Sequence, residues 1–452
     1  MAGRRLVTPP AAAAIHAVNS TIFNAPSGCP VGRFSAWVAV PRRVLTTAEP
    51  YGGAMRVAML HNRYRSGQPS GENTVVSQTI DLLRAAGHEV DLYAHDSDDI
   101  AGMSRKDRAL LPVRSVWSFS DERDLTQRWQ QRRPDIVHVH NTFPLFSPSV
   151  LRAAHGLRLP VVATLHNFRL MCANGVLQRG GGPCEDCVGR IPWRGVVHGC
   201  YRDSRVQSIP LAAGITVHRT AGTWRRYVTT FVAPSEFVRS RYVKDGYDAD
   251  QIVVKPHAVP QAGPMRTGAG EIVLFLGRLT EEKGFADLLD AWDASLGELV
   301  VVGDGPLRAA GEARAARDAS VRILGALPWQ DCMKLLPSAR VLVVPARSYE
   351  AFGLVVAEAF AHGVPVVASR IGALAELVED GSTGALTAPG DPADLRRALG
   401  RTVDPAVSTA CGERAREVYL QRFTPERDLA ATERIYAEAI ARRTAGTPTG
   451  GR

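Results

Sequence analysis

The 452-residue chain has no apolar run long enough to cross a bilayer, no block of like charges and few aromatic residues. A membrane-spanning helix needs about 20 consecutive apolar residues, so we expect a cytoplasmic protein, with contact at the inner membrane face left open. The formal net charge of +9 is dispersed along the chain, which is typical of a solvated surface. Aromatic residues make up only 7%, so the sequence does not favour base stacking, and no nucleic-acid partner is expected.

Cysteine is scarce and odd in number. Seven cysteines cannot form a complete disulfide framework, and in a reducing compartment clustered cysteines are more often metal ligands or buried thiols. Four of them fall in one stretch, which includes the C-x-x-C pair Cys184-Glu185-Asp186-Cys187. Four thiolates can form a tetrahedral structural zinc site, with reversible disulfides or buried thiols as alternatives. The candidate zinc ligands are Cys172, Cys184, Cys187 and Cys200.

The sequence lacks a fixed-period repeat, and its apolar residues come instead in short runs separated by helical patterns. Strands that alternate with helices indicate a parallel, doubly wound sheet. Around residues 259–270 proline, glycine and turn residues indicate a linker, after which the same alternation restarts. We therefore predict two α/β domains in series. The predicted strands are Val57–Leu60, Glu89–Tyr93, Ile136–His140, Val161–His166 and Thr230–Ala233, then Ile272–Leu276, Glu298–Val302, Val321–Ile323, Val341–Val344 and Val364–Ala368.

The domain boundaries follow from these runs. The first strand pattern begins at Met55, so we predict that the residues before it are a disordered or misannotated extension. A last helical pattern opens with Thr424 as N-cap and Pro425 at the first helical position. The predicted parts are an extension at 1–54, an N-terminal domain at 55–258 with a cysteine-rich insert at 172–200, a linker at 259–270, a C-terminal domain at 271–424, a helix at 425–442 and a disordered tail at 443–452.

Two cations stand at a strand-to-helix junction in the second half. The strand that ends at Leu276 runs into Gly277-Arg278-Leu279-Thr280-Glu281-Glu282-Lys283-Gly284. Beside a helix N-terminus, Arg278 and Lys283 can hold a diphosphate through charge-assisted hydrogen bonds, each worth roughly 1.5–3 kcal/mol. The alternative is two solvated side chains on a surface turn.

A second motif joins a buried strand, a loop and a helix. Gly353 opens the helix and lets a phosphate approach the backbone amides at its positive end. Glu358 lies about one and a half turns further on, where a carboxylate can accept both hydroxyls of a ribose. Glu350 on the preceding loop can point to a sugar, although two ordinary surface glutamates are the alternative. Gly303-Asp304-Gly305 follows another strand and indicates a tight turn at the cleft.

In this order and spacing, Gly277–Gly284, Gly303–Leu307 and the pair Glu350 and Glu358 resemble glycosyltransferase family 4. The resemblance extends from Met55 to about Ile440 and implies a GT-B fold. Two doubly wound Rossmann-like domains would face a cleft, and the C-terminal helix would cross back onto the first domain. It also implies an acceptor-side N-terminal domain, a C-terminal domain that binds a nucleotide sugar, and a subgroup with a four-cysteine insert.

The resemblance implies a retaining transferase in polysaccharide or related biosynthesis. The donor would be a UDP- or GDP-linked sugar, and the acceptor a glycan, a lipid-linked molecule or a small molecule. Contact with the membrane would be peripheral. A nucleotide-sugar epimerase or hydrolase of the same fold is the alternative, followed by a zinc-bearing nucleic-acid-binding protein. The sequence does not indicate the oligomeric state.

The resemblance further implies residue roles. Arg278 and Lys283 would hold the diphosphate, Glu358 the ribose and Glu350 the transferred sugar. The predicted donor contacts are Gly71, Gly277, Arg278, Lys283, Gly303, Phe352, Gly353, Leu354 and Glu358.

Two predicted site residues lie in the first half. His166, at the end of a predicted strand, resembles the family's active-site histidine, with a structural histidine as the alternative. Gly71 belongs to a glycine-bearing loop, where this chain has Ser70-Gly71 in place of the two glycines of many members. The predicted catalytic residues are His166, Arg278, Lys283 and Glu350.

The sequence shows neither a Ser-His-Asp signature nor a clear carboxylate pair for hydrolysis. By resemblance, the reaction would be a front-face displacement in which the leaving phosphate helps to deprotonate the acceptor. The cations and the helix end would then stabilise the departing diphosphate. The stretches Asp96-Ser97-Asp98 and Asp248-Ala249-Asp250 match a metal-binding motif only in letters, so no catalytic divalent metal is expected.

Overall fold

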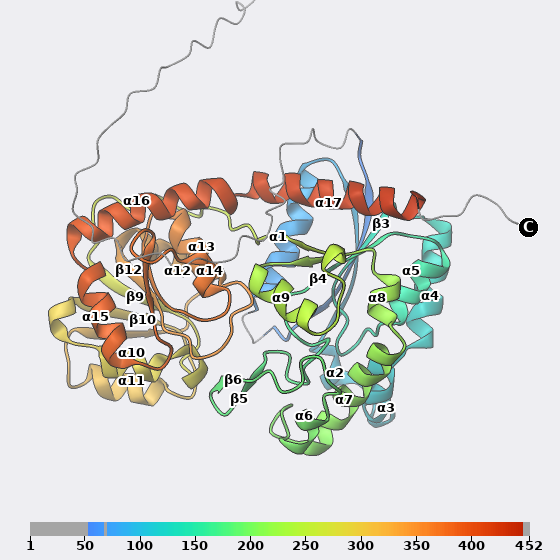
Figure 1. Ribbon diagram of the computed structural model, residues 1–452, viewed down its shortest axis with the longest axis horizontal. Helices are drawn as coiled ribbons and strands as arrows, with labels where there is room; N and C mark the ends of the chain where they lie inside the picture. The colour runs from blue at the N-terminus through green and yellow to red at the C-terminus, as the bar shows by residue number, and fades with distance from the viewer. Residues whose placement is uncertain (1–52, 67–69, 446–452) are drawn as a thin grey trace, which may run out of the picture. The chain divides into compact units, whose positions relative to one another are not determined.

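In the computed structural model, which describes residues 53–66 and 70–445, two six-stranded sheets make up the framework (Figure 1). Their strand orders are β2-β1-β3-β4-β7-β8 and β11-β10-β9-β12-β13-β14, and every strand pair within them is parallel. The prediction of two doubly wound α/β sheets is therefore confirmed. The strands are β1 Arg56–Arg63, β2 Glu89–Asp96, β3 Ile136–Asn141, β4 Val161–Thr164, β7 Thr230–Ala233, β8 Ile252–Val254, β9 Ile272–Leu276, β10 Glu298–Val302, β11 Val321–Gly325, β12 Ala339–Val344, β13 Val366–Ser369 and β14 Gly384–Thr387.

Helices separate these strands, as the alternating pattern predicts. The α-helices are α1 Gly71–Ala85, α2 Asp99–Gly102, α3 Arg105–Val116, α4 Phe119–Gln131, α5 Ser149–Gly156, α6 Trp193–Val197, α7 Arg205–Thr220, α8 Thr223–Tyr227, α9 Glu236–Lys244, α10 Phe285–Ala291, α11 Arg308–Ala315, α12 Trp329–Leu335, α13 Leu354–Ala361, α14 Leu374–Leu377, α15 Pro392–Thr402, α16 Pro405–Arg422 and α17 Pro425–Ala445. Short 3-10 turns are η1 Ala249–Gln251, η2 Glu281–Lys283, η3 Ala294–Leu296 and η4 Leu336–Ser338. None of the helices in the described ranges is long and apolar enough to cross a membrane.

All ten predicted strands are present, and β7, β9 and β10 begin and end where the sequence predicts. Four strands of the described chain were missed. β5 Gln178–Arg179 and β6 Gly182–Pro183 have two residues each and pair antiparallel with one another. β8 and β14 lie at a sheet edge and have only three or four residues, so neither carries a long apolar run. β4 ends at Thr164, two residues before the predicted end, so His166 lies on the loop beyond the strand.

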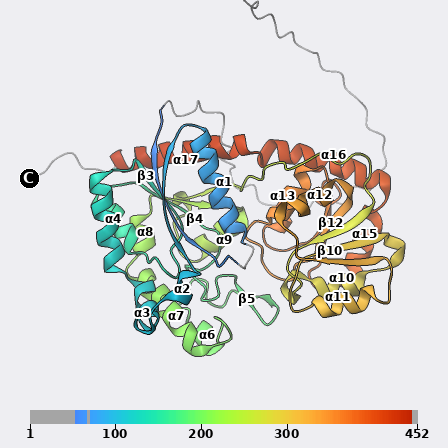
Figure 2. The same ribbon diagram turned by 180° about the vertical axis from the view of Figure 1, so that it is seen from behind.

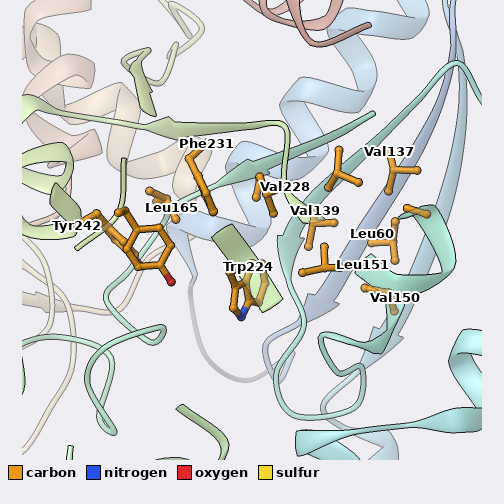
Figure 3. Packing of buried hydrophobic residues seen from close by; sticks show 14 of the residues in the cluster. Leu60, Val137, Val139, Val150, Leu151, Leu165, Trp224, Val228, Phe231 and Tyr242 are labelled. Carbon is orange, nitrogen blue, oxygen red and sulfur yellow. The ribbon is translucent and has the colours of Figure 1, made fainter. Parts of the chain in front are cut away.

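Alternation along β1 divides the core of the first sheet into two layers. Ala58 and Leu60 face one hydrophobic cluster, while Val57 and Met59 face the other, as expected for a strand buried on both faces. Figure 3 shows part of the first cluster, in which Leu60 lies among valines of β3 and apolar side chains of α5.

The second sheet is covered on both faces in the same way. On β9, Leu274 packs with Phe360 of α13, while Phe275 faces Leu288 of α10. The two faces therefore have separate cores, and the carboxyl ends of the strands remain available for loops that bind ligands.

The last helix returns to the first sheet, as the family resemblance implies. α16 and α17 follow one another along the same edge of both sheets (Figures 1 and 2). Ile435, Tyr436 and Ala439 of α17 complete the cluster that contains Val57 and Met59 of β1.

Two terminal predictions need comment. α17 begins at Pro425 as predicted, and the Thr424 hydroxyl accepts the Arg427 backbone N–H at 3.4 Å. The predicted tail starts too early, because α17 continues to Ala445, and the first glycine of the sequence after Pro425 is Gly446. Residues 446–452, like 1–52 of the predicted extension, lie outside the described residues.

Candidate active site

A cavity of about 330 Å³ lies where loops from the carboxyl ends of both sheets meet. This position is the usual ligand site of open α/β sheets, and the volume suits a small polar ligand. The predicted site residues that line it are Gly71, His166, Gly277, Lys283, Glu350, Phe352, Gly353 and Leu354. Three others, Arg278, Gly303 and Glu358, do not line it.

A cation and a carboxylate from separate loops meet in this cavity. Lys283 ends η2 after β9, and Glu350 lies on the loop between β12 and α13. The Lys283 ammonium donates a hydrogen bond to Glu350 Oε1, and its side chain is 30% exposed. The cavity therefore contains a partly exposed pair of opposite charges, in which each partner can exchange the other for a ligand group.

The N-terminus of α13 opens onto the same space. Gly353 precedes the helix in the left-handed region, with φ 98°, a conformation that favours glycine. Phe352, Gly353 and Leu354 all line the cavity. The first backbone N–H groups of a helix have no partner inside it and carry partial positive charge. This end of α13 is thus suited to an anionic group such as a phosphate.

Gly71 allows close approach between the two halves of the cavity wall. It is the first residue of α1, and a Cβ atom there would lie 2.8 Å from Leu354 Cδ1. A side chain at this position would therefore force the end of the Leu354 side chain to move within the cavity wall.

The remaining glycines serve the packing of loops. Gly303 has φ 148°, and a Cβ atom there would collide with the carbonyl oxygen of Gly277. Gly284 likewise lies against the carbonyl of Pro345. We conclude that Gly303 shapes the loop of Gly277 from behind, whereas Gly277 itself faces the cavity.

Arg278 and Glu358 have partners outside the cavity. The Arg278 guanidinium is 68% exposed and forms an ion pair with Glu282 at 2.9 Å. Glu358 lies on α13, where its Oε1 accepts the Trp329 indole N–H at 2.7 Å. Burial raises the pKa of Glu358. The hydrogen bond from the Trp329 indole N–H acts in the opposite direction, because it stabilises the charged carboxylate.

His166 takes part in a stacked chain of histidines. Its Nε2 lies 2.8 Å from His140 Nδ1, and its ring stacks on His257 with centroids 5.2 Å apart. Burial holds the pKa of both His140 and His166 well below the usual value, so both are neutral at neutral pH.

The hydrogen-bond directions in this chain can be assigned. His140 Nε2 lies 3.0 Å from Met59 Sδ, which can only accept, so this nitrogen carries the proton. His140 Nδ1 then accepts from His166 Nε2, which leaves Nδ1 of His166 as an acceptor. His166 can therefore receive a hydrogen bond from a hydroxyl in the cavity.

Two polar cavity residues escaped the sequence-based prediction. His257 follows β8, the missed edge strand, and Glu72 directly follows Gly71. An acidic residue in the first turn of a helix is common for electrostatic reasons, so Glu72 carried no separate signal beyond its position beside the glycine.

The loop that carries Glu350 is held by residues of the first half. Ser235 caps α9, because its hydroxyl accepts a 3.2 Å hydrogen bond from the Val238 N–H. Its hydroxyl also donates to the carbonyl of Ala351 at 2.8 Å. Tyr349 donates to Glu185 of the cysteine-rich insert at 2.9 Å. The insert therefore helps to fix a wall of the cavity.

The zinc site predicted from the cysteine spacing is not formed. Among the described residues, no three or more His, Cys, Asp or Glu side chains are arranged to hold a metal. Cys172 Sγ instead donates to Asn174 Oδ1 at 2.9 Å. Burial and the neighbouring cysteine thiols raise the pKa of Cys187 to about 11. The four cysteines of the insert are free thiols.

Comparison with known proteins agrees with this architecture. Residues 69–262 match the model described as Glycosyltransferase Family 4, and residues 270–404 match the one described as Glycosyl transferases group 1. Phosphatidyl-myo-inositol mannosyltransferase of Mycobacterium leprae (strain TN) is 28% identical over 366 residues, which cover 76% of this chain and 86% of that protein.

Solved structures share the fold. The structure of Anabaena Alr3699/HepE in complex with UDP has a TM-score of 0.58 and 17% identity, and covers 86% of this chain and 100% of that one. Sucrose-phosphate synthase from Thermosynechococcus elongatus has a TM-score of 0.59 and 21% identity over 86% of this chain and 99% of that one. At these identities the likeness shows the GT-B fold alone.

Proposed function

Because the chain belongs to glycosyltransferase family 4, with a GT-B fold, we propose that it is a retaining enzyme that uses a UDP- or GDP-linked sugar as donor. The acceptor is a hydroxyl of a glycan, a lipid-linked molecule or a small molecule. The observation that carries this proposal is the Lys283–Glu350 pair in front of the N-terminus of α13. HepE, which shares the fold, has been solved with UDP and with UDP-glucose.

The proposed donor uses both charges of the pair. A diphosphate placed at the N-terminus of α13 offers oxygens to the Lys283 ammonium, which then releases Glu350. The freed carboxylate can accept hydrogen bonds from hydroxyls of the transferred sugar. Negative charge grows on the diphosphate as the bond to the sugar breaks, and a fixed cation and helix end stabilise that charge without reorganisation. His166 supplies a further acceptor for the sugar.

We expect nucleotide binding to stabilise the protein. UDP or GDP at about 100 times its dissociation constant contributes about 2.7 kcal/mol to the free energy of unfolding, and ADP serves as the comparison. Glu358→Gln keeps an acceptor for the Trp329 indole but loses the charge proposed to bind the ribose. Loss of a charge-assisted bond of about 1.5 kcal/mol corresponds to roughly tenfold weaker binding.

A thermal-shift titration of UDP, GDP, ADP and their sugar conjugates measures this effect. Arg414→Ala on α16 removes an exposed ion pair with Glu417 and should leave the titration unchanged. Failure of every nucleotide to stabilise the folded wild type would contradict the donor site. Release of free sugar without any transfer product would instead favour the hydrolase alternative.

We also propose that the enzyme contacts a membrane through a surface formed by α3, α6, α7 and the turn before α6. α3 and α6 both pack against α7, and the three helices lie together in both views (Figures 1 and 2). These elements carry both exposed apolar and exposed cationic side chains, a composition suited to the interface of an anionic bilayer. The apolar members are Leu110, Val113, Ile191, Trp193, Val197, Val206, Ile209 and Val217, and exposed cations are Arg105, Lys106, Arg190, Arg194 and Arg205.

The double variant Trp193→Glu/Val206→Glu is expected to weaken vesicle binding at least tenfold, which is about 1.4 kcal/mol and less than the full burial of two such side chains provides. Co-sedimentation with phosphatidylglycerol-containing vesicles, against pure phosphatidylcholine, measures the change. Val407→Glu/Leu420→Glu alters two exposed apolar residues of α16 and is the matched control. Equal losses in both double variants would rule out a specific surface.

A further inference from the structure

Glu72 presents a buried carboxylate to the cavity from the side of the first sheet. It is the second residue of α1, its side chain is 8% exposed, and it lines the cavity. Oε2 accepts hydrogen bonds from the Tyr64 hydroxyl at 3.3 Å and from the Asn167 amide at 3.2 Å. Oε1 is buried and has no hydrogen-bond partner among the described residues. Buried polar atoms normally have a protein or water partner, so this oxygen is available to a donor from outside the described chain.

His61 offers a second unpaired atom beside it. His61 Nδ1 lies 3.9 Å from Glu72 Oε1 and is also buried without a partner in the described chain. His61 Nε2 lies 2.9 Å from Asn73 Oδ1. Because Asn73 Oδ1 also receives the Tyr64 backbone N–H at 3.2 Å, it is the acceptor, and His61 Nε2 must carry the proton.

This assignment determines whether His61 Nδ1 and Glu72 Oε1 are hydrogen-bond donors or acceptors. Burial lowers the pKa of His61, so the ring is neutral and its Nδ1 is a lone-pair acceptor. In its ionised form Glu72 Oε1 is an acceptor as well, and the two atoms lie 3.9 Å apart, so they do not satisfy one another. Together they form a site that needs donors from outside.

Among the described residues, no lysine or arginine forms an ion pair with Glu72. The charge of Arg169 lowers the pKa of Glu72, but its guanidinium donates its own hydrogen bonds to the carbonyls of Ala173 and Asn174. His166 is neutral, and across the cavity Lys283 is paired with Glu350. Tyr64 stays protonated because burial raises its pKa. Burial accordingly raises the pKa of Glu72 to about 7.

We propose that Glu72 and His61 form the subsite for the acceptor, in which Glu72 Oε1 and His61 Nδ1 accept hydrogen bonds from hydroxyls of a neutral sugar or polyol. Two acceptors without a donor between them bind hydroxyls and repel a phosphate or carboxylate. The inference rests on the proposed transferase function. It places the acceptor opposite the Lys283–Glu350 pair, on the wall built by α1.

Glu72→Gln tests the subsite. The glutamine amide can donate toward His61 Nδ1, which fills the subsite with a protein bond and should keep or raise the thermal midpoint. Stabilisation by nucleotide is expected to stay within twofold of the wild type, because the donor wall is untouched. Transfer to p-nitrophenyl glucoside, galactoside and mannoside is expected to fall about 30-fold or more in kcat/KM for the acceptor.

Two further readouts separate binding of acceptor from a structural role. In the wild type, kcat/KM for the acceptor should rise with pH as Glu72 loses its proton around pH 7, and Glu72→Gln should lack this inflection. The wild type should also prefer p-nitrophenyl glucoside to the matching glucuronide, and the variant should lose most of that preference.

The outcomes are distinct. Normal nucleotide binding with transfer within threefold of the wild type would overturn the subsite alone. Transfer to the glucuronide alone would overturn the proposal that the acceptor is neutral. The same conclusion would follow if no neutral glycoside accepted the sugar and none stabilised the protein. Absence of nucleotide binding in the wild type would overturn the proposed function, and this inference with it.

Discussion

Replacing Lys283 by alanine is expected to lower kcat/KM about 10²–10³-fold, the loss seen when one preorganised group that stabilises developing charge is removed. Among the described residues, the ammonium is the cation of the second half that lines the cavity beside the N-terminus of α13. Its loss removes attraction for the diphosphate and also leaves the Glu350 carboxylate without its partner. The unpaired carboxylate would repel the phosphates, so both effects act in the same direction.

This double effect can be resolved by a second substitution. In Lys283→Ala/Glu350→Gln the repulsion is gone, so nucleotide binding should recover in part while transfer stays low. Steady-state rates and nucleotide thermal shifts measure the two quantities separately. Lys334→Ala on α12 removes an exposed lysine that pairs with Asp331 and should behave as the wild type. Activity of Lys283→Ala within fivefold of the wild type would show that another group carries the diphosphate.

The donor loops were predictable because each lies next to a strand with a strong local signal. β9 and β12 are apolar runs, and the residues that follow them in sequence also follow them in space. Gly277, Lys283 and Gly353 were therefore placed at the cavity from the sequence. The pairing of Lys283 with Glu350 could not be predicted in this way. It depends on β9 and β12 being neighbours in the sheet, and no local sequence pattern indicates the strand order.

The acceptor wall was harder to predict for a similar reason. Glu72 and His61 come together only because α1 begins beside the end of β1. Taken alone, neither residue indicates a site, because Glu72 is an acidic residue in the first turn of a helix and His61 is a histidine within a strand. For the cysteine-rich insert the sequence predicted too much. Its cysteine spacing suggested a metal site, but among the described residues no three or more side chains are arranged to hold a metal. Its contribution comes instead from Glu185, through a bond to Tyr349.

Asp428→Asn is expected to destabilise the protein by about 3–5 kcal/mol, the usual cost of leaving one partner of a buried ion pair unpaired. Lys255 follows β8, and its ammonium donates to Asp428 in the first turn of α17. The two side chains are only 10% and 7% exposed. Without the carboxylate, the buried ammonium can regain solvent only if the start of α17 moves away. Hydrogen exchange should therefore speed up most at α17, including Tyr436 in the core.

Replacing both residues of the pair by apolar ones shows whether the Lys255–Asp428 ion pair itself stabilises the position of α17. Lys255→Met/Asp428→Leu leaves no buried charge, and apolar residues of similar size often replace a buried pair without loss. The double variant should therefore recover most of the stability in urea unfolding. Glu438→Gln removes an exposed pair with Arg434 on the same helix and should change the free energy of unfolding by less than about 0.5 kcal/mol. If Asp428→Asn changes it equally little, apolar packing of Tyr436 and its neighbours, not the ion pair, holds α17 against the first sheet.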